Sequence, residues 1–310
     1  MTNLEPNNKV IKPPPKSLFK YLEALGHQVF YFILFVGGHL SAYVLLLPVV
    51  FTYVLFSRKI HRQTSYYLQR RFQHQGPLRQ WFATFMVVKY FGQVLIDRAW
   101  LGMKKKASFE GELKGMHKLE QAINERKGLV LLTAHVGNWQ TALSDICQFP
   151  LQVNALMHYD EGHVTKHFFE LQGQPCPFHI INIDGFMGGM VEAAAALQRG
   201  EIVTIMGDRL TGGASAKVEF LGTPTYFPIS AYALAAKTDA SVAIMLSSKT
   251  SRKTYTLEID QVFKPNYENR ETRNAQLKKA VQIFVNSLES YLKDYPYQWY
   301  NFYDFWRQND

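Results

Sequence analysis

A histidine follows a short aliphatic segment near the middle of the chain. Residues 129–132 read Leu-Val-Leu-Leu, and residues 133–140 read Thr-Ala-His-Val-Gly-Asn-Trp-Gln. The aliphatic run predicts a buried strand, and Gly137 with Asn138 predicts its end and the start of a helix. His135 would then lie at the carboxyl end of a strand, where open α/β sheets carry their active sites. An imidazole accepts a proton near neutral pH, so this position favours a general base, with an ordinary core histidine as the alternative.

A second polar group follows another predicted strand. Residues 201–207 predict a strand that presents Asp208 and Arg209 at its carboxyl end, in the same kind of location as His135. A guanidinium offers a fork of donors for a phosphate or an oxyanion, and the carboxylate can orient it. A plain salt bridge at the strand end is the alternative.

Strand-like and helix-like segments alternate from about residue 107. This alternation predicts an α/β fold with a mixed, largely parallel central sheet and helices on both faces. The predicted strands are 128–135, 152–158, 178–183, 201–207, 216–221, 241–248 and 253–260. The predicted helices are 117–126, 138–147, 161–171, 187–199, 229–238 and 271–293. We expect a disordered tail over 1–16, membrane-anchoring and interfacial helices over 17–106, and a catalytic domain over 107–310.

A long apolar segment precedes this domain. Residues 29–56 are almost continuously apolar, and about 20 such residues suffice for a helix to cross a bilayer. Glycines 37 and 38 and Pro48 can instead break the run into a shallow hairpin in one leaflet, so an N-terminal membrane helix and a hairpin both stay open. A buried helix of a soluble protein is a third alternative. The basic residues directly after the run favour a cytoplasmic location for the domain that follows.

Composition indicates which partners suit the chain. Lys and Arg number 34 against 25 Asp and Glu, which gives a formal net charge of +9. Such a surface favours an acidic carrier protein or an anionic membrane surface, and the scattered basic residues do not favour nucleic acid. The sequence contains neither a Gly-x-Ser-x-Gly elbow nor a phosphate-binding glycine loop, so we expect neither a serine hydrolase nor a nucleotide cofactor. His163, His167 and Glu170 share one helical face, which is more typical of a solvated helix than of a metal site; we expect no metal.

Four blocks of sequence resemble one family in the same order. They are His-Val-Gly-Asn-Trp-Gln at 135–140, Met-Gly-Asp-Arg at 206–209, Val-Glu-Phe-Leu-Gly-Thr-Pro-Thr-Tyr-Phe-Pro at 218–228 and Tyr-Pro-Tyr-Gln-Trp at 295–299. The chain resembles the lysophospholipid acyltransferase superfamily, and within it the branch of the lipid A lauroyl and myristoyl acyltransferases. The resemblance implies a glycerol-3-phosphate acyltransferase-like fold. It also implies a place at the bacterial inner membrane, with the catalytic domain on the cytoplasmic side.

One position departs from the His-x4-Asp/Glu motif of that superfamily, because Gln140 stands where the acid is expected. The acid orients the imidazole and stabilises the imidazolium, whereas an amide supplies no charge. In serine protease triads the acid-to-amide change lowers turnover by about 10⁴-fold. Either another carboxylate such as Asp208 or Asp145 compensates, or the chain is a non-catalytic lipid-binding or scaffolding relative.

The resemblance implies transfer of a fatty acyl chain from acyl carrier protein or coenzyme A to a hydroxyl or amine of a membrane lipid, without a cofactor. His135 would be the general base, Gln140 would orient it, and Arg209 would neutralise phosphate or oxyanion charge. The residues expected to bind substrate are Asn138, Trp139, Asp208, Gly222, Thr223 and Pro224. Asn138 has an equally plain structural alternative as the cap of the following helix.

Overall fold

The computed structural model describes residues 18–73, 75–103, 109–138, 151–158, 178–210, 212–269 and 271–307, with side chains from residue 30 onward except that of residue 102. The expected tail over 1–16, most of the predicted helix 138–147, and the whole of 161–171 lie outside these residues. So do Trp139, Gln140 and Asp145, and so does the weak metal alternative at His163, His167 and Glu170.

The centre of the fold is a seven-stranded sheet with the order β1-β9-β8-β2-β5-β3-β4. Its strands are β1 Glu110–Lys114, β2 Leu129–Thr133, β3 Val153–Met157, β4 His179–Asn182, β5 Ile202–Met206, β8 Ser241–Lys249 and β9 Thr254–Phe263. Only β8 and β9 pair antiparallel within it, so the predicted mixed, largely parallel sheet is confirmed. Strands β6 Ser215–Phe220 and β7 Thr223–Pro228 form a separate hairpin.

Apolar side chains cover both faces of the sheet. Alternate residues of β2 point to opposite sides: Val130 and Leu132 join one buried cluster, whereas Leu129 and Leu131 join another. This two-sided burial explains the continuous aliphatic run in the sequence, because a strand covered on both faces needs no polar alternation. The first cluster includes α7 Met190–Gln198, α8 Ser230–Thr238 and α9 Arg273–Asp294, and the second includes α4 Met116–Asn124. Two short 3₁₀ helices, η1 Phe186–Gly189 and η2 Phe305–Arg307, complete the domain.

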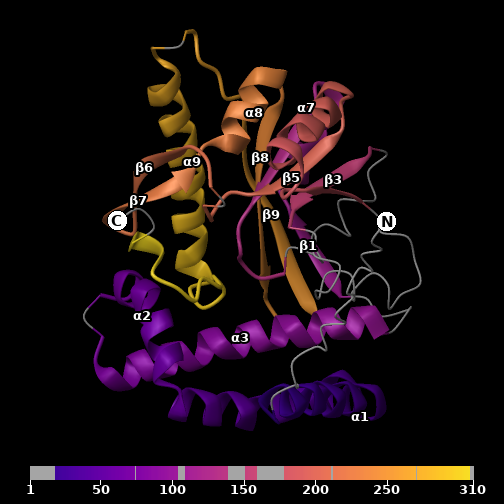
Figure 1. Cartoon of the computed structure of the whole chain (residues 1–310), viewed down its shortest axis with the longest axis vertical. Coiled ribbons are helices and arrows are strands. Elements are labelled where there is room, and N and C mark those ends of the chain that lie inside the picture. The colour runs from indigo at the N-terminus through magenta and orange to yellow at the C-terminus, as the bar shows by residue number, and fades with distance from the viewer. Residues whose placement is uncertain are drawn as a thin grey trace, which may run out of the picture.

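The N-terminal helices form a layer at one end of the sheet. They are α1 Leu18–Phe56, α2 Arg58–Arg71 and α3 Pro77–Met103. Figure 1 shows α3 running across the end of the sheet and α1 lying beyond it, alongside α3. Tyr67 of α2 and Val87 of α3 belong to the same buried cluster as the sheet, so these two helices pack as part of the main core.

Helix α1 is bent where its sequence predicts a break. Gly38 has φ 74° and ψ −174°, a backbone conformation that residues with a side chain rarely adopt. Within the described residues, 30–56 is the one segment long and apolar enough to cross a membrane. Its inner side packs on α3 through Leu34 and Ala42, whereas its outer side is exposed and apolar.

Within the central sheet, the strand that sequence patterning missed is β1. Residues 110–114 read Glu-Gly-Glu-Leu-Lys, and all five are exposed at the edge of the sheet, where they pair with β9. An edge strand without a buried face shows no apolar alternation, so nothing local in the sequence marks it.

Candidate active site

Strand register brings His135 and Asp208 side by side. Strands β2 and β5 are parallel neighbours, and Thr133 of β2 pairs with Met206 of β5. His135 and Asp208 each lie two residues beyond that pair, at the carboxyl edge of the sheet. The His135 Nδ1 atom lies 2.7 Å from Asp208 Oδ1, and the His135 backbone N–H donates to Oδ2 at 3.0 Å. Asp208 is therefore the carboxylate that orients the ring of His135.

Asp208 is fully buried and receives donors from the C-terminal segment as well. The indole Nε1–H of Trp299 donates to Oδ2 at 2.9 Å, and the Asn301 amide lies 3.4 Å from the same oxygen. Burial on its own raises the pKa of Asp208. The charge and hydrogen bonds of His135, with Arg209 nearby, lower that pKa further than burial raises it, so the net pKa lies well below its usual range. The carboxylate stays ionised at neutral pH, where it can stabilise an imidazolium.

The C-terminal segment also holds the backbone around His135. Tyr300 N–H donates to the His135 carbonyl at 2.9 Å, and Gly137 N–H donates to the Gln298 carbonyl at 3.0 Å. Gly137 has φ +56°, and a Cβ there would collide with the Ser247 carbonyl of β8. Only glycine lets the chain turn this close to the neighbouring strand, which explains the His-Val-Gly sequence.

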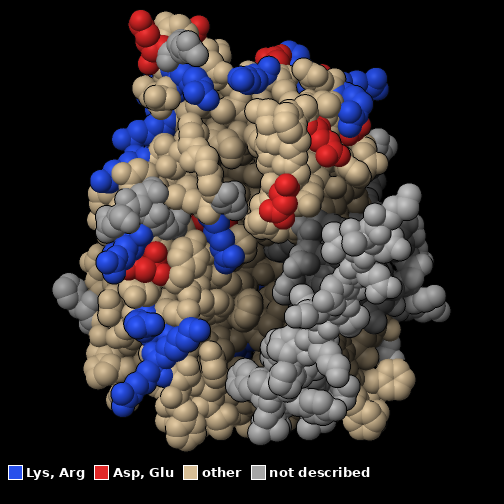
Figure 2. Space-filling view, viewed as in Figure 1, with Lys and Arg blue, Asp and Glu red and all other residues tan. Residues whose placement is uncertain are grey.

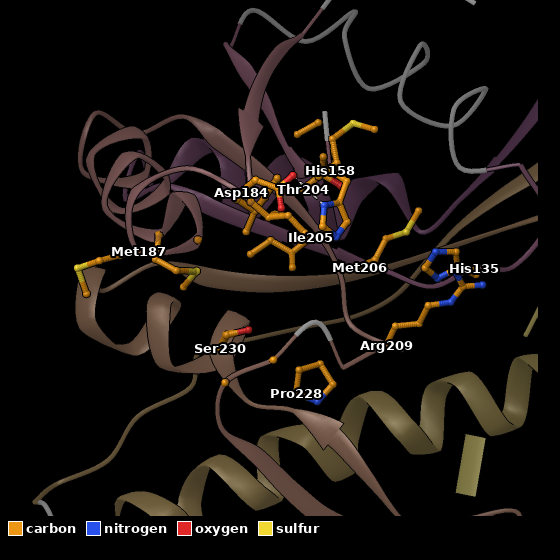
Figure 3. A pocket seen from close by; sticks show the side chains of 18 residues that line it. His135, His158, Asp184, Met187, Thr204, Ile205, Met206, Arg209, Pro228 and Ser230 are labelled. Atoms are coloured by element: carbon orange, nitrogen blue, oxygen red, sulfur yellow. Dashed lines mark hydrogen bonds and ion pairs between the residues drawn. The ribbon is translucent and has the colours of Figure 1, made fainter. Parts of the chain in front are cut away.

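Arg209 is fixed next to the same pair. Its Nε donates to Asn301 Oδ1 at 2.8 Å and its Nη2 to the Tyr300 carbonyl at 2.7 Å. These two bonds hold the guanidinium beside His135 at the rim of a cavity (Figure 3).

The cavity that His135 and Arg209 line has a volume of about 610 Å³, which is within the range of small-molecule sites. Figure 3 shows Met206 next to His135, followed by Ile205 and Thr204, with Met187 farther along. The apolar lining includes Ala155, Leu156, Met157, Ile183, Met187, Met190, Ile205 and Met206. Unbranched methionine side chains adapt to irregular apolar ligands, so this lining suits a flexible hydrocarbon chain.

The structure separates the other predicted site residues. Asn138, five residues beyond the end of β2, is buried. Gly222, Thr223 and Pro224 lie at the tip of the β6–β7 hairpin, and they are not among the described residues that line the cavity. Pro228, at the opposite end of that hairpin, and Ser230, the first residue of α8, do line it. A substrate contact at the hairpin tip stays a prediction.

Four residues around the site were not predicted from the sequence. Trp299 and Asn301, both in the C-terminal tail, donate hydrogen bonds to Asp208. His158 and Asp184 also line the cavity, and His158 Nδ1 lies 3.1 Å from Asp184 Oδ2. The family-like block at 295–299 was the one signal near the tail, and it did not indicate which side chains reach the site. Among the described residues, no group of three or more His, Cys, Asp or Glu side chains is arranged to hold a metal.

The site combines an oriented imidazole at the carboxyl ends of parallel strands with an adjoining apolar cavity. This combination is typical of an acid–base site for a substrate with a long hydrocarbon chain. Residues 80–308 match the family model described as bacterial lipid A biosynthesis acyltransferase, and the chain belongs to this family. The family implies an acyltransferase, with an acyl donor and a lipid acceptor. The comparison with curated proteins gave no match.

Proposed function

We propose that this protein transfers a fatty acyl chain from a carrier thioester to a hydroxyl or amine of a membrane lipid, with His135 as the general base. The observation that carries the proposal is the His135–Asp208 pair at the rim of the methionine-lined cavity. Asp208 occupies Nδ1, so Nε2 is the ring nitrogen that can accept a proton from the acceptor.

The proposed reaction needs no covalent enzyme intermediate. Nε2 of His135 takes the proton of the acceptor hydroxyl or amine as its oxygen or nitrogen attacks the thioester carbonyl. The tetrahedral intermediate then collapses, the C–S bond breaks, and the imidazolium returns the proton to the thiolate. Asp208 stabilises the imidazolium, and Arg209 is close enough to His135 to stabilise the oxyanion or bind an acceptor phosphate.

Asp208 can supply the negative charge that the neutral side chain of Gln140 lacks. His135 already contacts a buried, ionised carboxylate, so it does not need a negatively charged partner at position 140. Gln140 is therefore compatible with turnover. This geometry favours the first of the two alternatives raised by the motif, a compensating carboxylate, over a non-catalytic relative.

The direct test incubates purified protein with acyl-carrier-protein and acyl-coenzyme A thioesters and with lipid A precursors or lysophospholipids in mixed micelles. Formation of the acylated lipid, dependent on both substrates, is the expected result. Tight lipid binding with thioester and acceptor left unchanged would instead identify the non-catalytic, lipid-binding relative.

Surface charge supports an acidic donor or an anionic membrane. Figure 2 shows Lys and Arg side chains gathered along the flank of the molecule where α2 and α9 lie in Figure 1, with few Asp and Glu among them. We propose acyl carrier protein as the preferred donor, since its acidic surface complements such a flank. A lower KM for the carrier-bound thioester than for acyl-coenzyme A, rising with salt, is the measurement that supports this choice.

The cavity predicts a chain-length effect for Met190→Trp. A larger ring in the apolar lining shortens the space for the acyl chain, and each methylene left in water loses about 0.8 kcal/mol, or about fourfold in affinity. We expect kcat/KM for long-chain donors to fall at least tenfold relative to short ones. Met103→Trp, which adds the same ring on α3 away from the cavity lining, is the control, and an unchanged chain-length profile in Met190→Trp would place the chain elsewhere.

We propose that α1 lies in the plane of one leaflet on the cytoplasmic side and does not span the bilayer. His39, in the middle of the apolar run, lies 2.6 Å from Asp97 of α3, and α3 packs on the sheet. If α1 crossed the bilayer, the His39–Asp97 contact and the end of the sheet that α3 covers would lie near the bilayer centre. An in-plane α1 exposes only its outer face to lipid, and the exposed Arg58 and Lys59 that follow can meet the headgroups.

Depth measurements separate the two geometries. Val36, Val44 and Leu55 are all exposed on the outer side of α1. With nitroxides attached one at a time in vesicles, we expect similar shallow depths at all three sites for the in-plane helix. A deep value at Val44 with shallow values at the other two would indicate a span, and exposed Leu113 of β1 is the aqueous control.

A further inference from the structure

A second histidine–carboxylate group lies outside the proposed catalytic machinery. Asp97 of α3 is fully buried and accepts hydrogen bonds on both oxygens. His39 Nε2 and the Tyr43 hydroxyl, both from α1, reach Oδ1 at 2.6 and 2.7 Å. Lys249 Nζ, at the end of β8, reaches Oδ2 at 2.6 Å, and the Tyr255 hydroxyl of β9 reaches the same oxygen. One carboxylate therefore joins the outer helix α1, helix α3 and two strands of the sheet.

These contacts around Asp97 stabilise one arrangement of α1, α3 and the sheet. Lys249 is only 4% exposed, and its ammonium lies 4.5 Å from the centre of the Tyr255 ring. Burial lowers the pKa of Lys249, and the charge and hydrogen bond of Asp97 oppose that effect. A buried ammonium without its counter-charge is strongly unfavourable, so sliding of α3 along the sheet is strongly opposed.

The same lysine is connected to the His135 segment. The Lys249 backbone N–H donates to Gln298 Oε1 at 2.8 Å, and Gln298 Nε2 donates to the Lys249 carbonyl at 2.8 Å. The Gln298 carbonyl accepts from Gly137 N–H, two residues after His135. Trp299, the next residue after Gln298, donates to Asp208. A continuous series of buried hydrogen bonds thus runs from α1 to the His135–Asp208 pair.

We infer that Asp97 is a positioning residue for His135 and Asp208. It acts through Lys249 and Gln298, and it couples the packing of the lipid-facing helix α1 to the geometry of the site. The inference rests on the proposed function only for its kinetic consequence. Displacement of reacting groups by about 1 Å can lower a rate by about 10²-fold, so a small shift of the 135–138 backbone has a measurable effect.

The test compares Asp97→Asn and Gln298→Leu with the control Thr84→Val. Thr84 is buried on the same helix as Asp97 and bonds Thr64 of α2 at 3.0 Å, so its substitution removes a buried hydrogen bond of the same helical layer without touching the series. For both test variants we expect kcat to fall 10- to 100-fold with KM changed by less than threefold. We expect amide hydrogen exchange at Gly137 and Tyr300 to quicken at least tenfold. Thr84→Val should keep wild-type kcat and exchange at these amides.

Several results would overturn the inference. A folded Asp97→Asn protein with wild-type kcat and wild-type exchange at Gly137 contradicts it. Equal losses in Thr84→Val, at an equal drop in melting temperature, would show general loosening instead. If Asp97→Asn does not fold, Tyr43→Phe takes its place with the same expected changes in kcat and exchange, because it removes one hydrogen bond to Asp97 and leaves the Asp97–Lys249 charge pair intact. If the wild-type protein transfers no acyl chain, the proposed function fails, while the exchange measurement still decides the coupling.

Discussion

The His135→Ala variant is expected to lose about 10²- to 10⁴-fold in kcat, the range that general-base catalysis contributes. The substitution removes the imidazole that Asp208 orients at the cavity rim, and with it the acceptor for the proton of the attacking group. KM for both substrates should change little, because His135 contributes to proton transfer more than to binding. Initial rates with saturating thioester and lipid measure the effect.

His179→Ala is the matched control for this experiment. His179 lies 2.8 Å from the carboxylate of Glu192 but is exposed on β4, so it has a similar partner without facing the cavity. It should keep wild-type kcat. Unchanged transfer in His135→Ala would falsify the role of His135, and the base would have to be sought elsewhere.

Asp208→Asn is expected to lower kcat by about 10³- to 10⁴-fold, comparable to the acid-to-amide change in a serine protease triad. The amide keeps the size of the side chain but removes the charge that stabilises the imidazolium. Its oxygen can still accept from the His135 N–H and from Trp299, so its NH₂ group faces His135 Nδ1 and favours the tautomer in which Nε2 carries the proton and cannot act as a base. Some stability will be lost for the same reason, so kcat must be measured at a temperature at which circular dichroism shows the variant to be folded. Asp239→Asn, which alters an exposed carboxylate, is the control.

The companion variant Gln140→Glu separates the two explanations of the neutral residue. If Asp208 supplies the carboxylate, the wild-type enzyme already turns over, and Gln140→Glu should change kcat by less than about tenfold. A non-catalytic relative would show a near-zero wild-type rate and a large gain in Gln140→Glu. Full activity of Asp208→Asn would mean that the Asp208 contact serves the fold and not the reaction.

The sequence by itself determined the local parts of this protein. The aliphatic run at 129–132 predicted β2, because a strand buried on both faces must be apolar throughout. The predicted strand 216–221 corresponds to β6, and the predicted helix 271–293 corresponds to α9. The position of His135 at a strand end also followed from local signals, because Gly137 and Asn138 predict that the strand stops there.

Only the tertiary structure decided which groups His135 contacts. The pairing of Thr133 with Met206 aligns His135 with Asp208, and strand register between segments 73 residues apart leaves no mark in the periodicity of either segment. The contacts of Trp299 and Asn301 with Asp208, and of α1 with Asp97, likewise depend on how distant elements pack. Local sequence patterns indicate which faces of an element are buried. The partner of a buried polar group depends instead on which distant elements pack against it in the folded protein.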